Sequence, residues 1–322
     1  MEGLELTIDY GEAPGVERAV FLGSKDFGLS VFRSVLASSP DIVWNVIHPN
    51  DSHDQRSALV EWRKEAKALR VNLITTSSKA ETKRILKEYA PDIVFVCGWY
   101  QLLDAETLAL PPRGFWGIHN SLLPKYRGGS PLTWSMINGD EVVGSTVFEL
   151  SEEMDAGRIL HQVRVKNDTH DDIATILRKI EQALLKDLPQ KWSDLIGGSA
   201  ELHEQNGDEA TYCGQRRHYD GQIVWTQSAT EIHDFVRAQS APYPCAYTYL
   251  GDKQIKFLKT RISPKIVHGT PGQIMRLGKD GQDVVIAAGS HTALEVIKVE
   301  VDGQVQDPAL VLGSINDRLT TL

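Results

Sequence analysis

The strongest candidate for chemistry in this sequence is a histidine followed, 36 residues later, by an aspartate. Residues 114–131 read GFWGIHNSLLPKYRGGSP, in which His119 ends an apolar, strand-like run and glycines and a proline shape the loop after it. Asp155 lies in the sequence Met-Asp-Ala-Gly. A neutral imidazole can accept a proton near pH 7, and a carboxylate can orient it. By residue type alone, a structural role for His119 is the commoner explanation.

Alternating strands and helices in the first half of the chain must position these two residues. Apolar runs predict strands at residues 19–23, 42–47, 71–75 and 93–98, and helical spacing predicts helices at 24–39, 55–70 and 79–90. This order predicts an α/β fold, a Rossmann-like parallel sheet with helices on both faces. Such sheets bind ligands beyond the carboxyl ends of their strands. We therefore expect the site between the loop after Trp99, the His119 loop and the Asp155 loop.

The second half of the chain changes character. A helical stretch at 170–196, interrupted at Pro189, leads to a polar, glycine-rich segment. Short apolar runs then predict strands at 221–225, 246–250, 254–262, 272–277, 284–288 and 294–301, with one helix at 228–239. The sequence thus predicts an acidic tail (1–17), a catalytic domain (18–200), a linker (201–209) and a smaller β-rich, barrel-like (OB-like) domain (210–322).

Composition and charge exclude several classes of protein. The 322 residues carry a net charge of −9, and residues 205–322 hold 12 Lys/Arg and 13 Asp/Glu, so a nucleic-acid partner is not expected. No apolar run approaches the roughly 20 residues that span a bilayer. The three cysteines, Cys97, Cys213 and Cys245, form no CxxC pair, which argues against a disulfide framework or a zinc cluster. A cytoplasmic protein without a metal is expected, and Cys97 is expected to be a core residue.

The motif HxSLLPxYRG with a downstream MDAG resembles the formyltransferase family that uses 10-formyltetrahydrofolate. Residues 21–28 (FLGSKDFG), 94–103 (VFVCGWYQLL) and the stretch from residue 210 extend the resemblance over nearly the whole chain. It implies transfer of a formyl group from the folate to an amine, with His119 as base or hydrogen-bonding group and Asp155 assisting the proton transfers. It also implies that the folate binds Asp155 and the loop formed by Trp99, Tyr100, Gln101, Leu102 and Leu103.

One position departs from the family pattern. The family has an asparagine two residues before the histidine, as a donor to the oxyanion, whereas this chain has Gly117 there and Asn120 just after His119. Losing such a donor costs on the order of 3–4 kcal/mol in the transition state. Three readings stay open: Asn120 or a backbone N–H replaces the donor, the site runs a related folate or acyl reaction, or the protein binds its ligands with little catalysis.

The acceptor is the least determined part of the prediction. Ser121, Arg127, Arg216 and Arg217 are candidate substrate-binding residues, although Arg127 fits a structural turn equally well, and the arginine pair fits a solvated surface equally well. A small amine is expected, either a nucleotide-linked amino sugar or a hydroxyornithine-type compound, in a protein that could form a homodimer. The alternatives are a methionyl-tRNA formyltransferase and a folate-binding or 10-formyl-folate hydrolase relative with altered catalysis.

Overall fold

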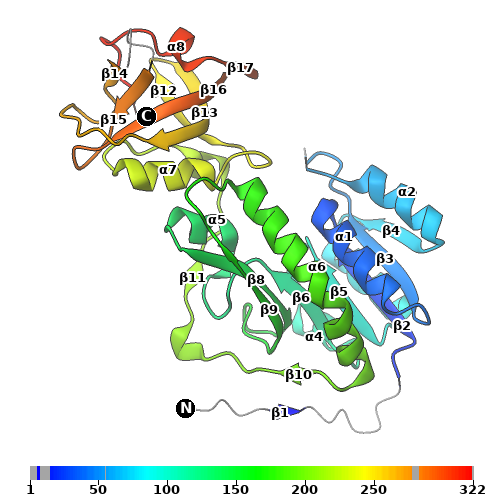
Figure 1. Ribbon diagram of the computed structural model, residues 1–322. Helices are drawn as coiled ribbons and strands as arrows, with labels where there is room; N and C mark the ends of the chain where they lie inside the picture. The colour runs from blue at the N-terminus through cyan, green and yellow to red at the C-terminus, as the bar shows by residue number, and fades with distance from the viewer. Residues whose placement is uncertain (1–5, 8–14, 55, 278–282, 321–322) are drawn as a thin grey trace. The chain divides into compact units, whose positions relative to one another are not determined.

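The computed structural model describes residues 6–7, 15–54, 56–277 and 283–320, which divide into two compact units (Figure 1). Unit 1 contains the described residues up to Gly128 together with 144–165 and 179–212. Unit 2 contains 129–143, 166–178 and the described residues from Cys213 onward. The units therefore interleave along the chain, whereas the sequence-based boundaries were continuous. Most of the acidic tail (residues 1–5 and 8–14) lies outside the described residues.

Unit 1 is built on a seven-stranded sheet, in the order β4-β3-β2-β5-β6-β8-β9. The strands are β2 (Arg18–Gly23), β3 (Val43–Pro49), β4 (Asn72–Thr76), β5 (Ile93–Cys97), β6 (Phe115–His119), β8 (Val142–Glu149) and β9 (Ile159–Lys166). The pairs from β4 to β6 are parallel, and β6 pairs with β8 in the antiparallel sense. The predicted Rossmann-like α/β fold is confirmed, because four apolar runs formed the strands expected of them.

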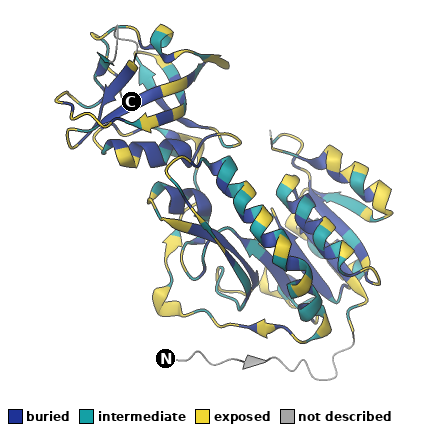
Figure 2. Ribbon diagram, viewed as in Figure 1, coloured by how far each residue is buried: buried dark blue, intermediate teal, exposed yellow. Residues whose placement is uncertain are grey.

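Helices cover both faces of this sheet because its strands alternate two sets of apolar side chains. One face presents Phe21, Trp44 and Phe95, which pack against aromatic residues of α1 (Lys25–Ala37), α2 (Leu59–Leu69) and α6 (Ile173–Gly197). The other face presents smaller aliphatic side chains to α3 (Lys79–Tyr89) and α4 (Ala105–Leu108). The central strands β2, β5 and β6 are consequently buried almost throughout, whereas the edge strands β4 and β9 are partly exposed, as Figure 2 shows.

The expected interruption of the long helix at Pro189 is wrong, since α6 continues through it to Gly197. Proline removes one backbone hydrogen bond from a helix interior. Here the residues on either side, Leu184, Leu188, Trp192 and Leu195, are buried at helical spacing, and this packing compensates for the lost bond. Among the described residues, no helix combines the length and apolar character that crossing a membrane requires.

The segment expected to be a linker is part of unit 1. Strand β10 (Glu201–Leu202) pairs with β1 (Leu6–Thr7), and His203 exchanges backbone hydrogen bonds with Ile159 of β9. A short turn of 3-10 helix, η1 (Gly207–Glu209), follows. The polar composition of this stretch therefore reflects an exposed path along unit 1.

Unit 2 contains an antiparallel sheet in the order β12-β13-β16-β15-β14, with β17 paired to β16. Its elements are β12 (Ala246–Leu250), β13 (Lys253–Ile262), β14 (Ile274–Leu277), β15 (Asp283–Ala287), β16 (Ala293–Val301), β17 (Gln304–Gln306) and the short helix α8 (Pro308–Val311). Helix α7 (Ala229–Arg237) starts at a capping box between Ser228 and Glu231, and it buries Ile232 and Val236 in the core of the sheet. The predicted β-rich second half is confirmed.

Two features of unit 2 were not foreseen. Residues 221–225 do not form the expected strand: Ile223 and Trp225 are buried, but the segment is irregular and makes only an isolated bridge at Gln222. In addition, unit 2 includes α5 (Pro131–Ile137) and residues 166–178. Arg237 of α7 holds the latter segment by donating to the side chain of Asn167 and the carbonyl of Asp171.

Candidate active site

The parallel strands of unit 1 all end at one edge of the sheet. Because β2, β3, β5 and β6 run the same way, the loops after Gly23, Pro49, Cys97 and His119 leave from neighbouring positions. Loop residues held by a rigid sheet are where binding and catalysis concentrate. His119 is the last residue of β6 and is 8% exposed. Its position matches the prediction that the histidine ends a strand.

The structure brings the two predicted catalytic residues together. Nδ1 of His119 lies 3.7 Å from Oδ2 of Asp155. The same carboxylate oxygen accepts the backbone N–H of Gly128 at 2.8 Å. Asp155 has a left-handed backbone conformation (φ 53°), which an aspartate adopts more readily than most residues. The 3.7 Å separation exceeds a direct hydrogen bond.

A second hydrogen bond identifies which ring nitrogen of His119 can act. Nε2 lies 2.7 Å from the carbonyl oxygen of Tyr126. A carbonyl cannot donate, so Nε2 must carry a hydrogen. In the neutral ring, the basic lone pair is therefore on Nδ1, which faces Asp155. A proton taken up at Nδ1 would form an ion pair with the carboxylate, which suits His119 to accept a proton from a reacting group.

The Asp155 loop is held from behind by a residue that the sequence did not single out. The side-chain amide of Gln205 donates to the carbonyls of Asp155 (2.8 Å) and Gly157 (2.7 Å). Its oxygen accepts hydrogen bonds from the guanidinium of Arg127, which is 3% exposed. Arg127 also pairs with Glu153 at 3.1 Å. Of its two open roles, the structural one is therefore favoured, since Arg127 and Gln205 position Asp155.

Close packing fixes the identity of one loop residue. A Cβ at Gly157 would lie 1.9 Å from the carbonyl oxygen of Glu149, so no other residue fits there without moving the backbone. The glycine in the Met-Asp-Ala-Gly sequence thus lets the loop fold back on β8 and reach His119. No sequence signal marks Gln205, because it stands in a polar stretch 50 residues from Asp155.

The space above Gly117 is occupied by a side chain of the protein itself. A Cβ at Gly117 would lie 2.6 Å from Cδ1 of Leu150 and 3.4 Å from the carbonyl oxygen of Val96. Leu150 follows β8 and packs against the apolar cluster on this face of the sheet. Residues 117 and 119 share one face of β6. Leu150 therefore fills the space that a side chain at position 117 would need.

Asn120 and Ser121 make contacts away from the His119–Asp155 pair. The amide of Asn120 lies 3.0 Å from the hydroxyl of Ser145, which is also 3.2 Å from the carbonyl of His119. Ser121 is 2% exposed, and its hydroxyl donates to the carbonyl of Lys125 at 2.7 Å. Ser121 thus stabilises the turn after β6, and Asn120 ties that turn to β8.

The loop predicted to bind the folate follows β5 and presents unusual side chains. Tyr100 and Leu102 are 55% and 77% exposed, which is high for apolar residues at a sheet edge. The indole Nε1 of Trp99 and the amide oxygen of Gln101 are buried, and neither has a hydrogen-bond partner in the described part of the chain. Buried polar groups are normally paired. Trp99 and Gln101 thus each carry a buried polar atom that the described part of the chain does not satisfy.

Arg216 and Arg217 both lie in unit 2, but their surroundings differ. The guanidinium of Arg216 sits 4.8 Å from the ring centroid of Trp134 and 5.3 Å from that of Phe235, and it donates to Gln239. Burial lowers its pKa. Arg216 thus stabilises unit 2, whereas Arg217 is exposed at the start of a short 3-10 turn, η2 (His218–Gly221).

Cys97 is the last residue of β5 and is buried in the core of unit 1. Burial raises the pKa of this thiol to about 12, which makes it unreactive. Within the described ranges, no three His, Cys, Asp or Glu side chains are arranged to hold a metal ion.

Comparison with known families places both parts of the chain. Residues 34–191 match the family described as "Formyl transferase", and residues 217–310 match "Formyl transferase, C-terminal domain". The chain is 30% identical over 291 residues to a methionyl-tRNA formyltransferase of Desulfotalea psychrophila, covering 89% of each chain. It is 27% identical over 291 residues to the methionyl-tRNA formyltransferase of Bacillus subtilis, covering 89% of this chain and 91% of the relative.

Solved structures share the fold at lower identity. The sugar 3N-formyltransferase WlaRD, solved with dTDP and 5-N-formyl-THF, superposes with a TM-score of 0.66 at 16% identity, over 90% of this chain and 99% of that one. An N-formyltransferase of Helicobacter canadensis, in complex with folinic acid and dTDP-3-aminofucose, gives a TM-score of 0.65 at 15% identity, over 87% of this chain and 98% of that one.

Proposed function

The chain belongs to the formyl transferase family, and we propose that it moves a formyl group from 10-formyltetrahydrofolate to the amine of a small molecule. Family membership confirms the sequence-based prediction of a formyltransferase. The observation that carries the proposal is the His119–Asp155 pair at the carboxyl edge of the sheet, with Nδ1 of His119 facing the carboxylate at 3.7 Å.

The loop after β5 supports a reduced folate as donor. The indole N–H of Trp99 and the amide oxygen of Gln101 have no hydrogen-bond partner in the described part of the chain, and a small movement of the loop would let them pair with the acceptors and donors on a pterin edge. The exposed side chains of Tyr100 and Leu102 would be covered by its apolar parts. When bound, the folate supplies a formyl group activated by its attachment to N10.

This chain's own groups would manage the proton of the amine. Nδ1 of His119 would accept the proton that the attacking nitrogen loses as it bonds to the formyl carbon, and Asp155 would stabilise the resulting imidazolium. The imidazolium would then give this proton to N10 as the bond between N10 and the formyl carbon breaks. The Gly128 N–H and the Gln205 amide keep the carboxylate in place during this step. General base catalysis of this kind contributes roughly 10²–10⁴ in rate.

The charge distribution supports a small acceptor rather than a nucleic acid. The chain carries a net charge of −9, and Arg216 of unit 2 is enclosed by Trp134, Phe235 and Gln239. At the carboxyl edge of the sheet in unit 1, the ammonium of Lys25 is paired with Asp51 and Asp54, so it is not free to neutralise the phosphates of a nucleic acid.

Methionyl-tRNA is the second candidate acceptor, and the relatives at 27–30% identity over most of the chain favour it. A transfer-RNA enzyme requires binding that falls steeply as salt rises, because phosphate contacts release counterions. A sugar or hydroxylamine acceptor gives a much shallower salt dependence.

One experiment separates these possibilities. Calorimetric titration with 5-formyltetrahydrofolate tests donor binding by the wild type and by His119→Ala. Transfer from 10-formyltetrahydrofolate is then measured with nucleotide-linked amino sugars, with N-hydroxyornithine and with initiator methionyl-tRNA, at 50 and 200 mM salt.

Folate binding by both proteins, with formyl transfer to a small amine by the wild type only, is the expected result. Transfer to methionyl-tRNA alone would replace the acceptor but keep the chemistry. Release of formate without any amine would indicate a hydrolase. Absence of folate binding by either protein would refute the proposal.

A further inference from the structure

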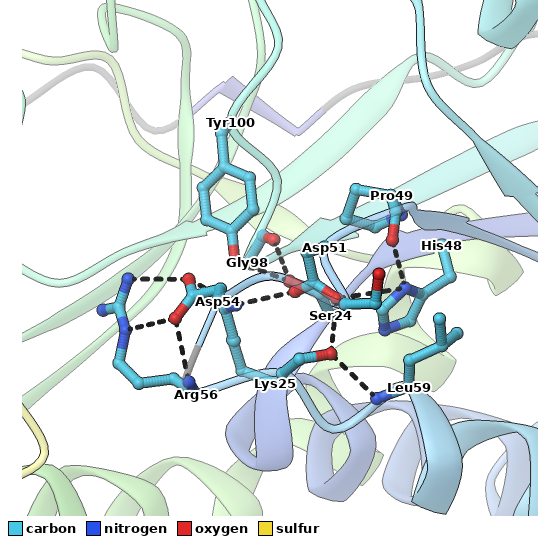
Figure 3. A network of polar contacts seen from close by, with 12 residues as sticks. Ser24, Lys25, His48, Pro49, Asp51, Asp54, Arg56, Leu59, Gly98 and Tyr100 are labelled. Carbon is cyan, nitrogen blue, oxygen red and sulfur yellow. Dashed lines mark hydrogen bonds and ion pairs between the residues drawn. The ribbon is translucent and has the colours of Figure 1, made fainter.

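Three loops at the carboxyl edge of the sheet in unit 1 meet at one lysine. Nζ of Lys25 lies 2.6 Å from Asp51 and 2.8 Å from Asp54, both in the loop after β3 (Figure 3). The same ammonium lies 5.3 Å from the ring centroid of Tyr100, in the loop after β5. The carbonyl of Lys25 accepts the indole N–H of Trp62 on α2. Lys25 itself begins α1, directly after β2.

Neighbouring bonds tie the loop after β5 to the same point. The hydroxyl of Ser24 donates to the carbonyl of Gly98 and lies 2.9 Å from the hydroxyl of Tyr100. The backbone N–H of Ser24 donates to Cys97 at 3.1 Å. A Cβ at Gly98 would lie 2.7 Å from the carbonyl of Ser24, so the two loops touch at their backbones. Figure 3 shows Tyr100 pointing towards Ser24 and Gly98.

These contacts join two loops across the position where a sheet of this kind commonly binds its ligand. The strand order reverses between β2 and β5, and open α/β sheets usually bind ligands in the crevice at that point. Here the loops after β2 and β5 are bonded directly across it. Within the second loop, Tyr100 faces Ser24 and Lys25 on the β2 side and is still 55% exposed, and Leu102 is 77% exposed.

Ion pairs strengthen the contacts of Lys25 with the loop after β3. Burial opposes the charge of Lys25, but hydrogen bonds to Asp51 and Asp54 outweigh it and raise the pKa of the ammonium. Burial likewise opposes the charge of Asp54, and hydrogen bonds from Lys25 and Arg56 lower the pKa of its carboxyl well below the usual range. The lysine is 17% exposed and the two carboxylates are 6% and 24% exposed, so solvent screens the pairs only partly.

Resting on the proposed function, we propose that Lys25 is a positioning residue for folate binding. Fixed between Asp51 and Asp54, it supports the ring of Tyr100 and so holds the loop Trp99–Leu103 in the conformation that receives a reduced folate. The loop exposes the side chains of Tyr100 and Leu102, which meet a ligand in a fixed arrangement only if the loop is held still.

The test compares Lys25→Met with a matched control, Arg33→Gln. Both changes remove a cation that bridges elements of unit 1, because Arg33 on α1 pairs with Glu65 on α2 at 2.7 Å. Arg33 contacts none of the three loops in its hydrogen bonds. Dissociation constants for 5-formyltetrahydrofolate are measured for both variants and for Tyr100→Phe, which keeps the ring but removes the hydroxyl bonded to Ser24. Hydrogen exchange of the amides of residues 98–103 is measured without ligand, and thermal unfolding checks the fold.

We expect Lys25→Met to weaken folate binding about tenfold or more and to speed exchange in residues 98–103. Tyr100→Phe should weaken binding by a smaller factor, and Arg33→Gln should leave both readings within about twofold of the wild type. Wild-type affinity and wild-type exchange in Lys25→Met would overturn the inference. Faster exchange in Lys25→Met with no folate binding by the wild type would preserve the role of Lys25 in holding the loop and refute the proposed function instead. If Lys25→Met does not fold, hydrogen exchange in Tyr100→Leu decides, because this change removes the ring that Lys25 supports: wild-type exchange of residues 98–103 in that variant would overturn the inference.

Discussion

Restoring an asparagine at position 117 should raise activity only if Leu150 is shortened at the same time. An added Cβ at Gly117 would lie 2.6 Å from Cδ1 of Leu150, whereas carbon atoms pack best at about 3.5–4.0 Å. Leu150 would have to move by roughly 1 Å to make room. We therefore compare Gly117→Asn, Leu150→Ala and the double variant with the wild type.

The magnitudes follow from these contacts. Crowding Leu150 in the single variant should cost about 1–3 kcal/mol of folding free energy, the usual penalty for overpacking. Shortening Leu150 removes the clash, and because this leucine is only partly buried, its loss should cost less than the roughly 2–5 kcal/mol of a fully buried one. A well-placed donor to the charge that develops on the formyl oxygen is worth roughly 10²–10³ in kcat. A donor introduced without optimised support should recover part of this, about tenfold or more.

Initial rates of tetrahydrofolate release with the best acceptor amine measure the effect, and urea unfolding measures the stability. The expected pattern is little change in kcat for either single variant and a gain for the double variant. A full gain in Gly117→Asn alone, without loss of stability, would show that Leu150 does not obstruct the position. No gain in the double variant would show that the charge is already stabilised by another group, with Asn120 the first to be tested by truncation.

Two further predictions concern histidines. His119→Ala should lower kcat by roughly 10²–10⁴. Its free energy of unfolding should fall by only about 1–3 kcal/mol, because the Tyr126 carbonyl loses its donor. If urea unfolding shows instead that the variant is unfolded, the loss of activity would indicate a structural role for His119. Burial lowers the pKa of His233 from its usual 6.5, although its hydrogen bond to the Thr169 carbonyl acts the other way. The unfolded state then binds more protons, so the stability that His233 contributes is complete above about pH 6.5 and is lost as the pH falls towards the depressed value. Urea unfolding between pH 8 and pH 5 should show a shallower loss for His233→Gln than for the wild type, and identical slopes would contradict this assignment.

The sequence predicted the sheet of unit 1 well because its signals are local. A short apolar run such as residues 93–98, with helical segments before and after it in the sequence, is typical of a strand that is buried on both faces of a parallel sheet. Pro189 misled because helix packing, which depends on residues far away, outweighed a local breaker. In the run at 221–225, Ile223 and Trp225 are buried but Val224 is exposed, and this partial burial does not by itself specify a strand. Interleaving of residues 129–143 and 166–178 into unit 2 leaves no mark in composition.

The candidate site, like the fold, could be predicted only in part from the sequence. Motif spacing located His119 and Asp155, and the structure brings them to 3.7 Å. Motif spacing could not show that the side chain of Arg127 is bound to Gln205, because an arginine in a turn has the same sequence pattern whether it binds a ligand or a neighbouring amide. Gln205 could not be predicted either, because its role depends on contacts with residues far away in the sequence. Supporting residues are chosen by three-dimensional contacts, which spacing along the chain does not record.

Different residues hold the two loops of the candidate site. Arg127 and Gln205 hold the Asp155 loop, whereas Lys25 with Asp51 and Asp54 holds the folate loop. Residues that share no contacts usually act additively. Loss of Gln205 should therefore mainly impair proton transfer, with a smaller loss of folate affinity because Asp155 is also expected to contact the folate. Loss of Lys25 should mainly weaken folate binding. Coupling between the two would imply that the folate itself connects the loops, since the bonds that hold each loop do not include a residue of the other.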